Sequence, residues 1–160
     1  MSSIYIMRHG DAIGRAATDA ERPLSELGQA DAAKMVPSLL EQPPTLLWVS
    51  PYLRAQQTAA IVVTGLVQAG HSPKIETIPN ITPEDNPFTL VEALADLNQG
   101  PLMLVSHNPF VSTLLSLLTE GHTQARIGMA TASIACVQGE VTGLGTMDLQ
   151  WYKAPCDLAI

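Results

Sequence analysis

Four basic side chains in this sequence have the chemical types needed to handle a phosphoryl group. Arg8 and His9 form an Arg-His-Gly tripeptide with Gly10, Arg54 ends a Ser-Pro-Tyr-Leu-Arg segment, and His107 stands in a Ser-His-Asn-Pro segment. Arginine offers planar, bidentate donors that stay charged. A neutral histidine nitrogen can attack phosphorus while the second ring nitrogen is held as a donor. The set predicts phosphoryl transfer, in which basic groups neutralise charge on the equatorial oxygens.

Each of these segments follows an apolar run that has the length and composition of a buried strand. The runs are bounded by Pro, Gly or polar residues, as expected for strands covered on both faces, and they span residues 4–7, 46–49 and 102–105. Further strands are expected over residues 74–78, 133–137 and 146–151. A turn containing Gly139, Gly143 and Gly145 should join the last two into a hairpin at the edge of the sheet.

Helical segments separate the strands. The clearest covers residues 54–69, where apolar residues recur on one stripe and Gly70 is placed to end the helix. An earlier helix is expected from an N-cap at Ser25 to about Glu41, with Pro37 kinking it or ending it near Val36. Two later helices should each start at a proline after an asparagine cap and end at a glycine. The first has Asn86 as its cap, Pro87 as its first residue and Gly100 at its end. The second has Asn108, Pro109 and Gly121 in the same places.

This alternation predicts an α/β fold in a single domain over residues 1–160. We expect a mostly parallel central sheet of about six strands with helices on both faces. Ligands bind beyond the carboxyl ends of the strands in such sheets. The three polar segments should therefore meet at one rim, and the helix expected at Pro109 would point its free amide groups toward it.

Composition narrows the classes of partner. A formal charge of −7, from 8 Lys+Arg against 15 Asp+Glu, would repel a phosphate backbone, so nucleic acid is not an expected partner. The first apolar run is interrupted at once by Arg8, so neither a signal peptide nor a membrane span is predicted, and a cytoplasmic protein is expected. Cys136 and Cys156 are expected to be reduced thiols. No segment has the spacing of a metal-ligand cluster.

The motifs resemble the signatures of the histidine phosphatase superfamily, in which the first strand ends in Arg-His-Gly. Residues 50–58 look like the second signature of that superfamily, and Ser106-His107 looks like the third. The short chain, Asp11, residues 22–25 and Gly28 look most like its SixA-type phosphohistidine phosphatases, which lack the helical insertion of larger relatives. The resemblance implies a phosphoglycerate mutase-like fold without a large helical insertion and a phosphohistidine phosphatase that needs no metal or organic cofactor.

The resemblance also implies a role for each site residue. His9 would be the nucleophile that carries the phosphoryl group, while Arg8, Arg54 and His107 would bind and stabilise that group. Two nearby residues stay open. Arg22 either binds the phosphate as well or forms a salt bridge with Asp19 or Glu21 that braces its loop, and Asp11 either orients a catalytic group or ends the strand.

The sequence departs from the family pattern at the general acid. Many relatives have a carboxylate near the position occupied here by Asn80, and an amide cannot donate a proton as an acid. A phosphate ester benefits from such an acid by about 10²- to 10⁴-fold, whereas imidazole is a much easier leaving group. The missing acid therefore favours phosphohistidine on a phosphotransfer or phosphocarrier protein as the substrate, although Glu84 or Asp85 could supply a proton.

Two alternatives to this function stay open. If Glu84 or Asp85 acts as an acid, the protein would be a small-molecule phosphate-ester phosphatase of the same superfamily. A binding module that recognises phosphohistidine without turnover is the second alternative, and retention of both histidines and both arginines argues against it. A mutase is not expected, since the chain has no room for the insertion that encloses such a substrate.

Overall fold

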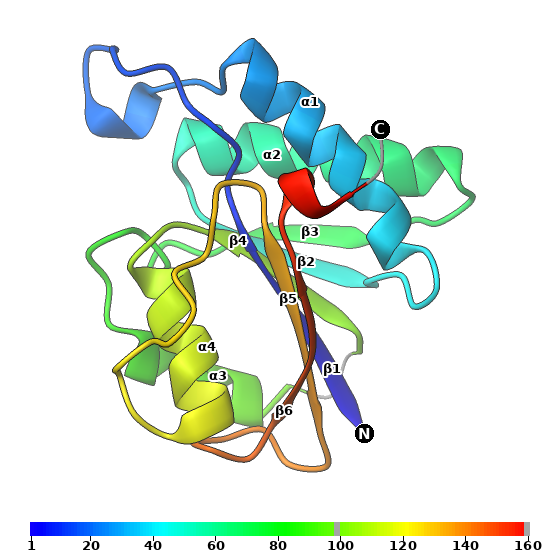
Figure 1. Ribbon diagram of the computed structural model, residues 1–160, viewed down its shortest axis with the longest axis vertical. Coiled ribbons are helices and arrows are strands. Elements are labelled where there is room, and N and C mark those ends of the chain that lie inside the picture. Colours follow the sequence, from blue (N-terminus) through cyan, green and yellow to red (C-terminus); the bar gives the residue numbers. More distant parts are fainter. Residues whose placement is uncertain (98–99, 159–160) are drawn as a thin grey trace.

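The computed structural model describes residues 1–97 and 100–158. Its centre is a six-stranded sheet in the order β3-β2-β4-β1-β5-β6 (Figure 1). The first four strands of this order are parallel, and β5 and β6 pair antiparallel at one side. The strands are β1 (Ser2–Arg8), β2 (Leu46–Val49), β3 (Lys74–Thr77), β4 (Leu102–Ser106), β5 (Ile134–Gly139) and β6 (Asp148–Lys153).

Two pairs of helices cover the two faces of the sheet (Figure 1). On one face lie α1 (Glu26–Met35) and α2 (Leu53–Gln68), and on the other lie α3 (Pro87–Ala95) and α4 (Phe110–Glu120). Short 3₁₀ helices are η1 (Asp19–Glu21), η2 (Val36–Leu39) and η3 (Pro155–Asp157). The predicted α/β fold is confirmed, and no large helical unit interrupts the alternation of strands and helices within the described ranges.

The central strands are apolar on both sides because successive side chains point to opposite faces. In β1, Tyr5 and Met7 join the core under α1 and α2, whereas Ile4 and Ile6 join the core under α3 and α4. The strands β2 and β4 alternate in the same way. Burial on both faces makes the strands that precede the polar segments rigid supports for them.

Most predicted boundaries agree with the structure to within a few residues. Ser25 caps α1 by accepting the Gly28 N–H, and α1 ends at Met35, just before the 3₁₀ turn that contains Pro37. The last two strands form the expected edge hairpin. Asn86 caps α3 with Pro87 as its first residue, and Gly121 ends α4 with φ of 81°.

Two predicted boundaries are wrong. The helix α4 begins at Phe110, one residue late, because the Asn108 side chain bonds Met129 O and Ser112 instead of capping the helix. The helix α3 ends at Ala95 rather than near Gly100, with Asp96 in a turn as its C-cap. Residues 98 and 99, which the longer helix would have included, lie outside the described residues, as do residues 159 and 160 of the expected domain.

Two glycines allow the segment after β1 to cross the start of α1. A Cβ on Gly10 would lie 2.7 Å from Gly28 O, and a Cβ on Gly28 would lie 2.1 Å from Asp11 O. Backbone atoms cannot retreat as a flexible side chain can, so neither position accepts a side chain without displacement of the chain. This crossing sets the position of His9, which directly precedes Gly10.

We predict that Gly28→Ala lowers the free energy of unfolding by about 2 kcal/mol, because the new methyl group overlaps Asp11 O. Urea denaturation measures the change. The control is Gly14→Ala, since a Cβ at Gly14 meets nothing within 4 Å. Equal stability of the Gly28 and Gly14 variants would show that the crossing tolerates a side chain.

Candidate active site

The three polar segments meet at the carboxyl edge of neighbouring strands. The strand β4 lies between β2 and β1, with Arg8 beside Ser106 and Val49 beside Val105. Backbone hydrogen bonds continue one residue past each ladder, from His9 N to Ser106 O and from Ser50 N to Val105 O. The predicted convergence of these segments is therefore confirmed, and their order places the segment of His107 between those of His9 and Arg54.

His9 is held as a neutral imidazole with one defined tautomer. Its side chain is buried, and Nδ1 lies 2.7 Å from Gly10 O, a carbonyl that only accepts, so Nδ1 carries the ring proton. Its Nε2 then presents a lone pair, which accepts the Arg54 Nε–H at 3.3 Å. Burial, followed by the charges of Arg54, Arg8 and Arg22, lowers the pKa of His9 to about 4. A neutral, oriented Nε2 is what a nucleophile requires.

Arg54 is a buried guanidinium at the start of α2, with 4% of its surface exposed. Besides His9, it contacts Asp19, through NH1 to the main-chain O at 2.7 Å and NH2 to Oδ2 at 3.2 Å. The carbon of the guanidinium lies over the ring of Tyr52, 5.1 Å from its centroid. Asp19, Tyr52 and His9 thus all contact the Arg54 side chain.

His107 lies against both His9 and Ser50. The two imidazole rings are 5.1 Å apart, and His107 Nε2 is 2.6 Å from Ser50 Oγ. Because Ser50 Oγ also accepts the Tyr52 N–H, its own hydrogen is available to Nε2, which would leave the ring proton of His107 on Nδ1. Burial and then the charges of His9 and Arg54 lower the pKa of His107 to about 3, so this ring acts as a neutral donor rather than a cation.

Arg8 ends β1 beside His9, and its NH1 donates to Met129 O at 3.0 Å. Burial, with a smaller effect from Arg54, lowers the pKa of Arg8. Among the residues that the structure describes, Arg8 Nε and His107 Nδ1 are buried nitrogens without a hydrogen-bond partner. Unpaired buried donors are costly, so these two N–H groups beside the Arg54 cation favour an anion as their acceptor.

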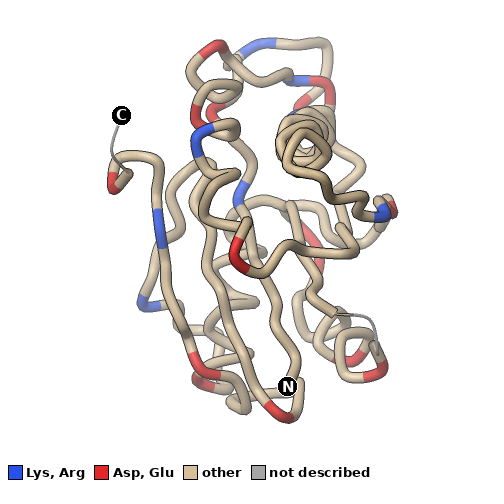
Figure 2. The backbone as a smooth tube through the Cα atoms, turned by 90° about the vertical axis from the view of Figure 1, so that its right-hand side faces the viewer, with Lys and Arg blue, Asp and Glu red and all other residues tan. Residues whose placement is uncertain are grey.

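Arg22 makes the predicted ion pair with Asp19, at 3.0 Å between Arg22 Nε and Asp19 Oδ1 but without hydrogen-bond alignment. The Arg22 charge also contributes to the low pKa of His9, which places the guanidinium near the nucleophile. In Figure 2 basic and acidic positions of the loop after β1 alternate at the top of the view. The positive charge of the site is therefore local, within an acidic chain.

Asn80, Glu84 and Asp85 lie on the loop that precedes α3. Ser106 Oγ donates to Ile81 O at 2.6 Å and thereby ties this loop to the end of β4. The Asp85 carboxylate accepts hydrogen bonds from Thr82 N and Thr82 Oγ1, so it closes a turn. Asn80 and Glu84 are exposed. Of the two carboxylates expected as alternative acids, Asp85 is hydrogen-bonded within its own turn and Glu84 is exposed to solvent.

One supporting residue, Thr58, was not singled out from the sequence. Thr58 accepts the Gly10 N–H and donates to Arg54 O, so one hydroxyl links the nucleophile loop to α2. Asp11 accepts the Ser25 hydroxyl at 2.7 Å, which gives it a structural role at the cap of α1. Thr58 lies four residues after Arg54 and therefore on the same face of α2. This spacing could have indicated from the sequence that Thr58 lies near the site.

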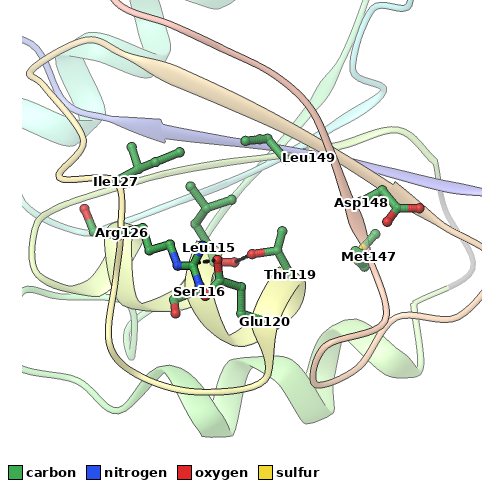
Figure 3. A pocket seen from close by; sticks show the side chains of 10 residues that line it. Leu115, Ser116, Thr119, Glu120, Arg126, Ile127, Met147, Asp148 and Leu149 are labelled. Atoms are coloured by element: carbon green, nitrogen blue, oxygen red, sulfur yellow. Dashed lines mark hydrogen bonds and ion pairs between the residues drawn. The ribbon is translucent and has the colours of Figure 1, made fainter.

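A separate pocket of about 320 Å³ lies between α4 and β6 (Figure 3). Its Glu120 and Arg126 pair with each other at 3.3 Å. None of the predicted site residues lines it. We therefore place the candidate active site at the carboxyl edge of β1, β2 and β4.

Residues 1–97 and 100–158 contain neither a clustered set of metal ligands nor a membrane-spanning helix. No group of three or more His, Cys, Asp or Glu side chains there is arranged to hold a metal ion. No helix in these ranges has the length and apolar character needed to cross a membrane. Cys136 and Cys156 are both free thiols, as predicted.

A neutral nucleophilic nitrogen, one buried and one partly buried guanidinium group and a second imidazole are suited to accept a phosphoryl group. A family model described as the histidine phosphatase superfamily (branch 1) matches residues 4–77. Together with the full-length relative described next, this match shows that the chain belongs to the histidine phosphatase superfamily.

The similarity extends over the whole chain. Phosphohistidine phosphatase SixA of Escherichia coli (strain K12) is 32% identical over 160 aligned residues, which cover 97% of this chain and 95% of that protein. The structure of the protein histidine phosphatase SixA complexed with tungstate superposes with a TM-score of 0.86 at 30% identity, covering 98% of this chain and 99% of that one.

A more distant structure shares the fold alone. Phosphoserine phosphatase from Entamoeba histolytica, in complex with 3-phosphoglyceric acid, superposes with a TM-score of 0.68 at 15% identity. It covers 96% of this chain and 98% of that one. Phosphatases that are named for different substrates thus share this fold, so the fold alone does not identify the substrate.

We predict that His9 and His107 stay neutral as the pH falls from 7 to 5, because burial lowers the pKa values to about 4 and about 3. Imidazole ¹⁵N NMR measures the protonation of each ring. The unfolded chain takes up these protons near pH 6.5, so the free energy of unfolding should decrease as the pH falls from about 6.5 to 4. Protonation of either ring between pH 7 and 5 would contradict the assignment.

Proposed function

We propose that this protein is a phosphohistidine phosphatase, in which His9 accepts the phosphoryl group from a phosphohistidine on a phosphotransfer or phosphocarrier protein and then passes it to water. Residues 1–160 would act as one histidine phosphatase domain. The SixA relative of Escherichia coli, named a phosphohistidine phosphatase, supports this substrate class.

The first step forms a bond between His9 Nε2 and phosphorus while the bond from phosphorus to the substrate nitrogen breaks. The Nδ1–H of His9 stays on Gly10 O, so the attacking nitrogen needs no deprotonation. The low pKa of His9 keeps the lone pair available down to about pH 4. Because His9 is buried, its ring is already largely shielded from water before the phosphate enters the site.

The charge on the transferring group falls between the basic side chains. Arg54 points its Nε at the position of attack, at 3.3 Å from Nε2. Arg8 Nε and His107 Nδ1 would supply the remaining donors to the equatorial oxygens. Because these groups are fixed by protein contacts before the substrate arrives, little reorganisation is needed in the transition state.

The leaving group requires little help from the protein. A substrate imidazole that is protonated on its other nitrogen leaves as a neutral ring, so no acid is needed at the position of Asn80. Water then attacks phosphorus, the bond to Nε2 breaks, and orthophosphate and neutral His9 are formed. The observation that carries the proposal is the hydrogen-bonded set of Gly10, His9 and Arg54, which fixes both the tautomer and the direction of attack.

We predict that His9→Ala lowers kcat for phosphohistidine hydrolysis by more than about 10³-fold, because the phosphoryl acceptor is removed. A panel of ³²P-labelled phosphohistidine proteins, incubated with each variant, measures turnover. Wild type should also trap label that is lost in acid and kept in base. His71→Ala is the control, since His71 follows α2 at the other end of the sheet. Absence of both label and turnover in wild type would overturn the enzyme proposal.

We predict that Glu84→Gln leaves kcat on phosphohistidine within about twofold, because imidazole departs without an acid. If Glu84 were the general acid, kcat should fall by about 10²-fold or more. Glu92→Gln, an exposed charge removal within α3, is the matched control. Parallel rates on a sugar phosphate test the alternative substrate class, and a faster wild-type rate there, abolished by Glu84→Gln, would favour an ester phosphatase.

A further inference from the structure

The most informative contact outside the four predicted site residues is made by Asp19 in η1. Its main-chain O accepts Arg54 NH1 at 2.7 Å, and its Oδ2 accepts Arg54 NH2 at 3.2 Å. The same O also accepts the Arg22 N–H, and Oδ1 lies 3.0 Å from Arg22 Nε. One residue thus contacts two arginines near the nucleophile.

The contacts select one edge of the Arg54 guanidinium. A guanidinium can donate two parallel hydrogen bonds from either of two edges. NH1 and NH2 form the edge at its free end, and NH2 and Nε form the edge at its side. Asp19 binds NH1 and NH2, so it occupies the first edge. The second edge is left facing His9, as the contact between Arg54 Nε and His9 Nε2 shows. The ring of Tyr52 lies 5.1 Å from the guanidinium carbon, and Asp19 restrains the NH1 and NH2 end of the group.

Asp19 is not suited to act as the missing acid. Desolvation raises the pKa of its carboxyl, but the hydrogen bond and charge of Arg54, with those of Arg22, together lower it overall. An ionised carboxylate accepts hydrogen bonds and has no proton to give. A role through Arg54 therefore fits the geometry better than a role in proton transfer.

We propose that Asp19 is a positioning residue, whose carboxylate holds the Arg54 guanidinium so that its Nε and NH2 edge faces the phosphoryl group on His9. The inference rests on the proposed phosphohistidine hydrolysis and assigns one further residue to that reaction. A guanidinium that turns within its plane would present a single N–H to phosphate instead of two, and misplacement of this kind is costly in the transition state.

The test compares Asp19→Asn with Asp19→Ala. Both variants remove the same charge, but asparagine keeps an oxygen that accepts the NH2 hydrogen bond and alanine does not. We expect kcat on a phosphohistidine protein to stay within about threefold for Asp19→Asn and to fall about 10-fold for Asp19→Ala. The matched control is Glu21→Ala, which removes a carboxylate of the same helix that bonds Thr18 and is exposed.

A second measurement does not depend on turnover. The ¹⁵N-bound hydrogen of Arg54 Nε, assigned by its loss in Arg54→Lys, is protected in wild type by the bond to His9. Its exchange with water should accelerate about 10-fold in Asp19→Ala and less than threefold in Asp19→Asn or Glu21→Ala. If wild type hydrolyses no phosphohistidine, the proposed function fails, while the exchange rates still decide the role of Asp19.

Two results would overturn the proposal. Equal kcat and exchange rates in Asp19→Asn and Asp19→Ala would show that only the charge matters. Tighter inhibition by orthophosphate in both variants, with kcat at or above that of wild type, would show instead that the carboxylate competes with phosphate for the arginines.

Discussion

The site depends on a buried guanidinium held against a neutral imidazole. Arg54 is almost fully buried, and a cation in that position is stable only when its donors are paired. Asp19, Tyr52 and His9 provide those contacts. Burial and, after it, the same charge lower the pKa of His9, so the group that would stabilise phosphate also helps to keep the nucleophile unprotonated.

The sheet makes this arrangement rigid. Three parallel strands in the order β2-β4-β1 end at the same level, and each carries one part of the site beyond its last residue. The strands are buried on both faces, so movement of one end would disturb both cores. Further hydrogen bonds join the loops above the sheet, from Gly10 to Thr58 and from Ser106 to Ile81. The nucleophile and its donors are thus preorganised by packing.

The loop before α3 bears on the choice of substrate. The loop is tied by Ser106 to the strand end that precedes His107, and it carries the exposed Asn80 and an Asp85 whose carboxylate is hydrogen-bonded by Thr82. A site rich in donors to phosphate but poor in proton donors suits a leaving group that departs neutral. Phosphohistidine meets that condition, and an alkyl phosphate does not.

The sequence by itself determined the fold class, the three strand-end segments and the residues Arg8, His9, Arg54 and His107, because burial patterns and parallel-sheet topology are local and regular. It left Arg22 open between phosphate binding and a salt bridge with Asp19 or Glu21, and the structure shows the pair with Asp19. The contact of Asp19 with Arg54, the link through Thr58 and the neutral state of both imidazoles were decided only by the tertiary structure. Contacts between loops 35 or more residues apart leave no periodic pattern, and a pKa depends on how deeply the assembled chain buries the group.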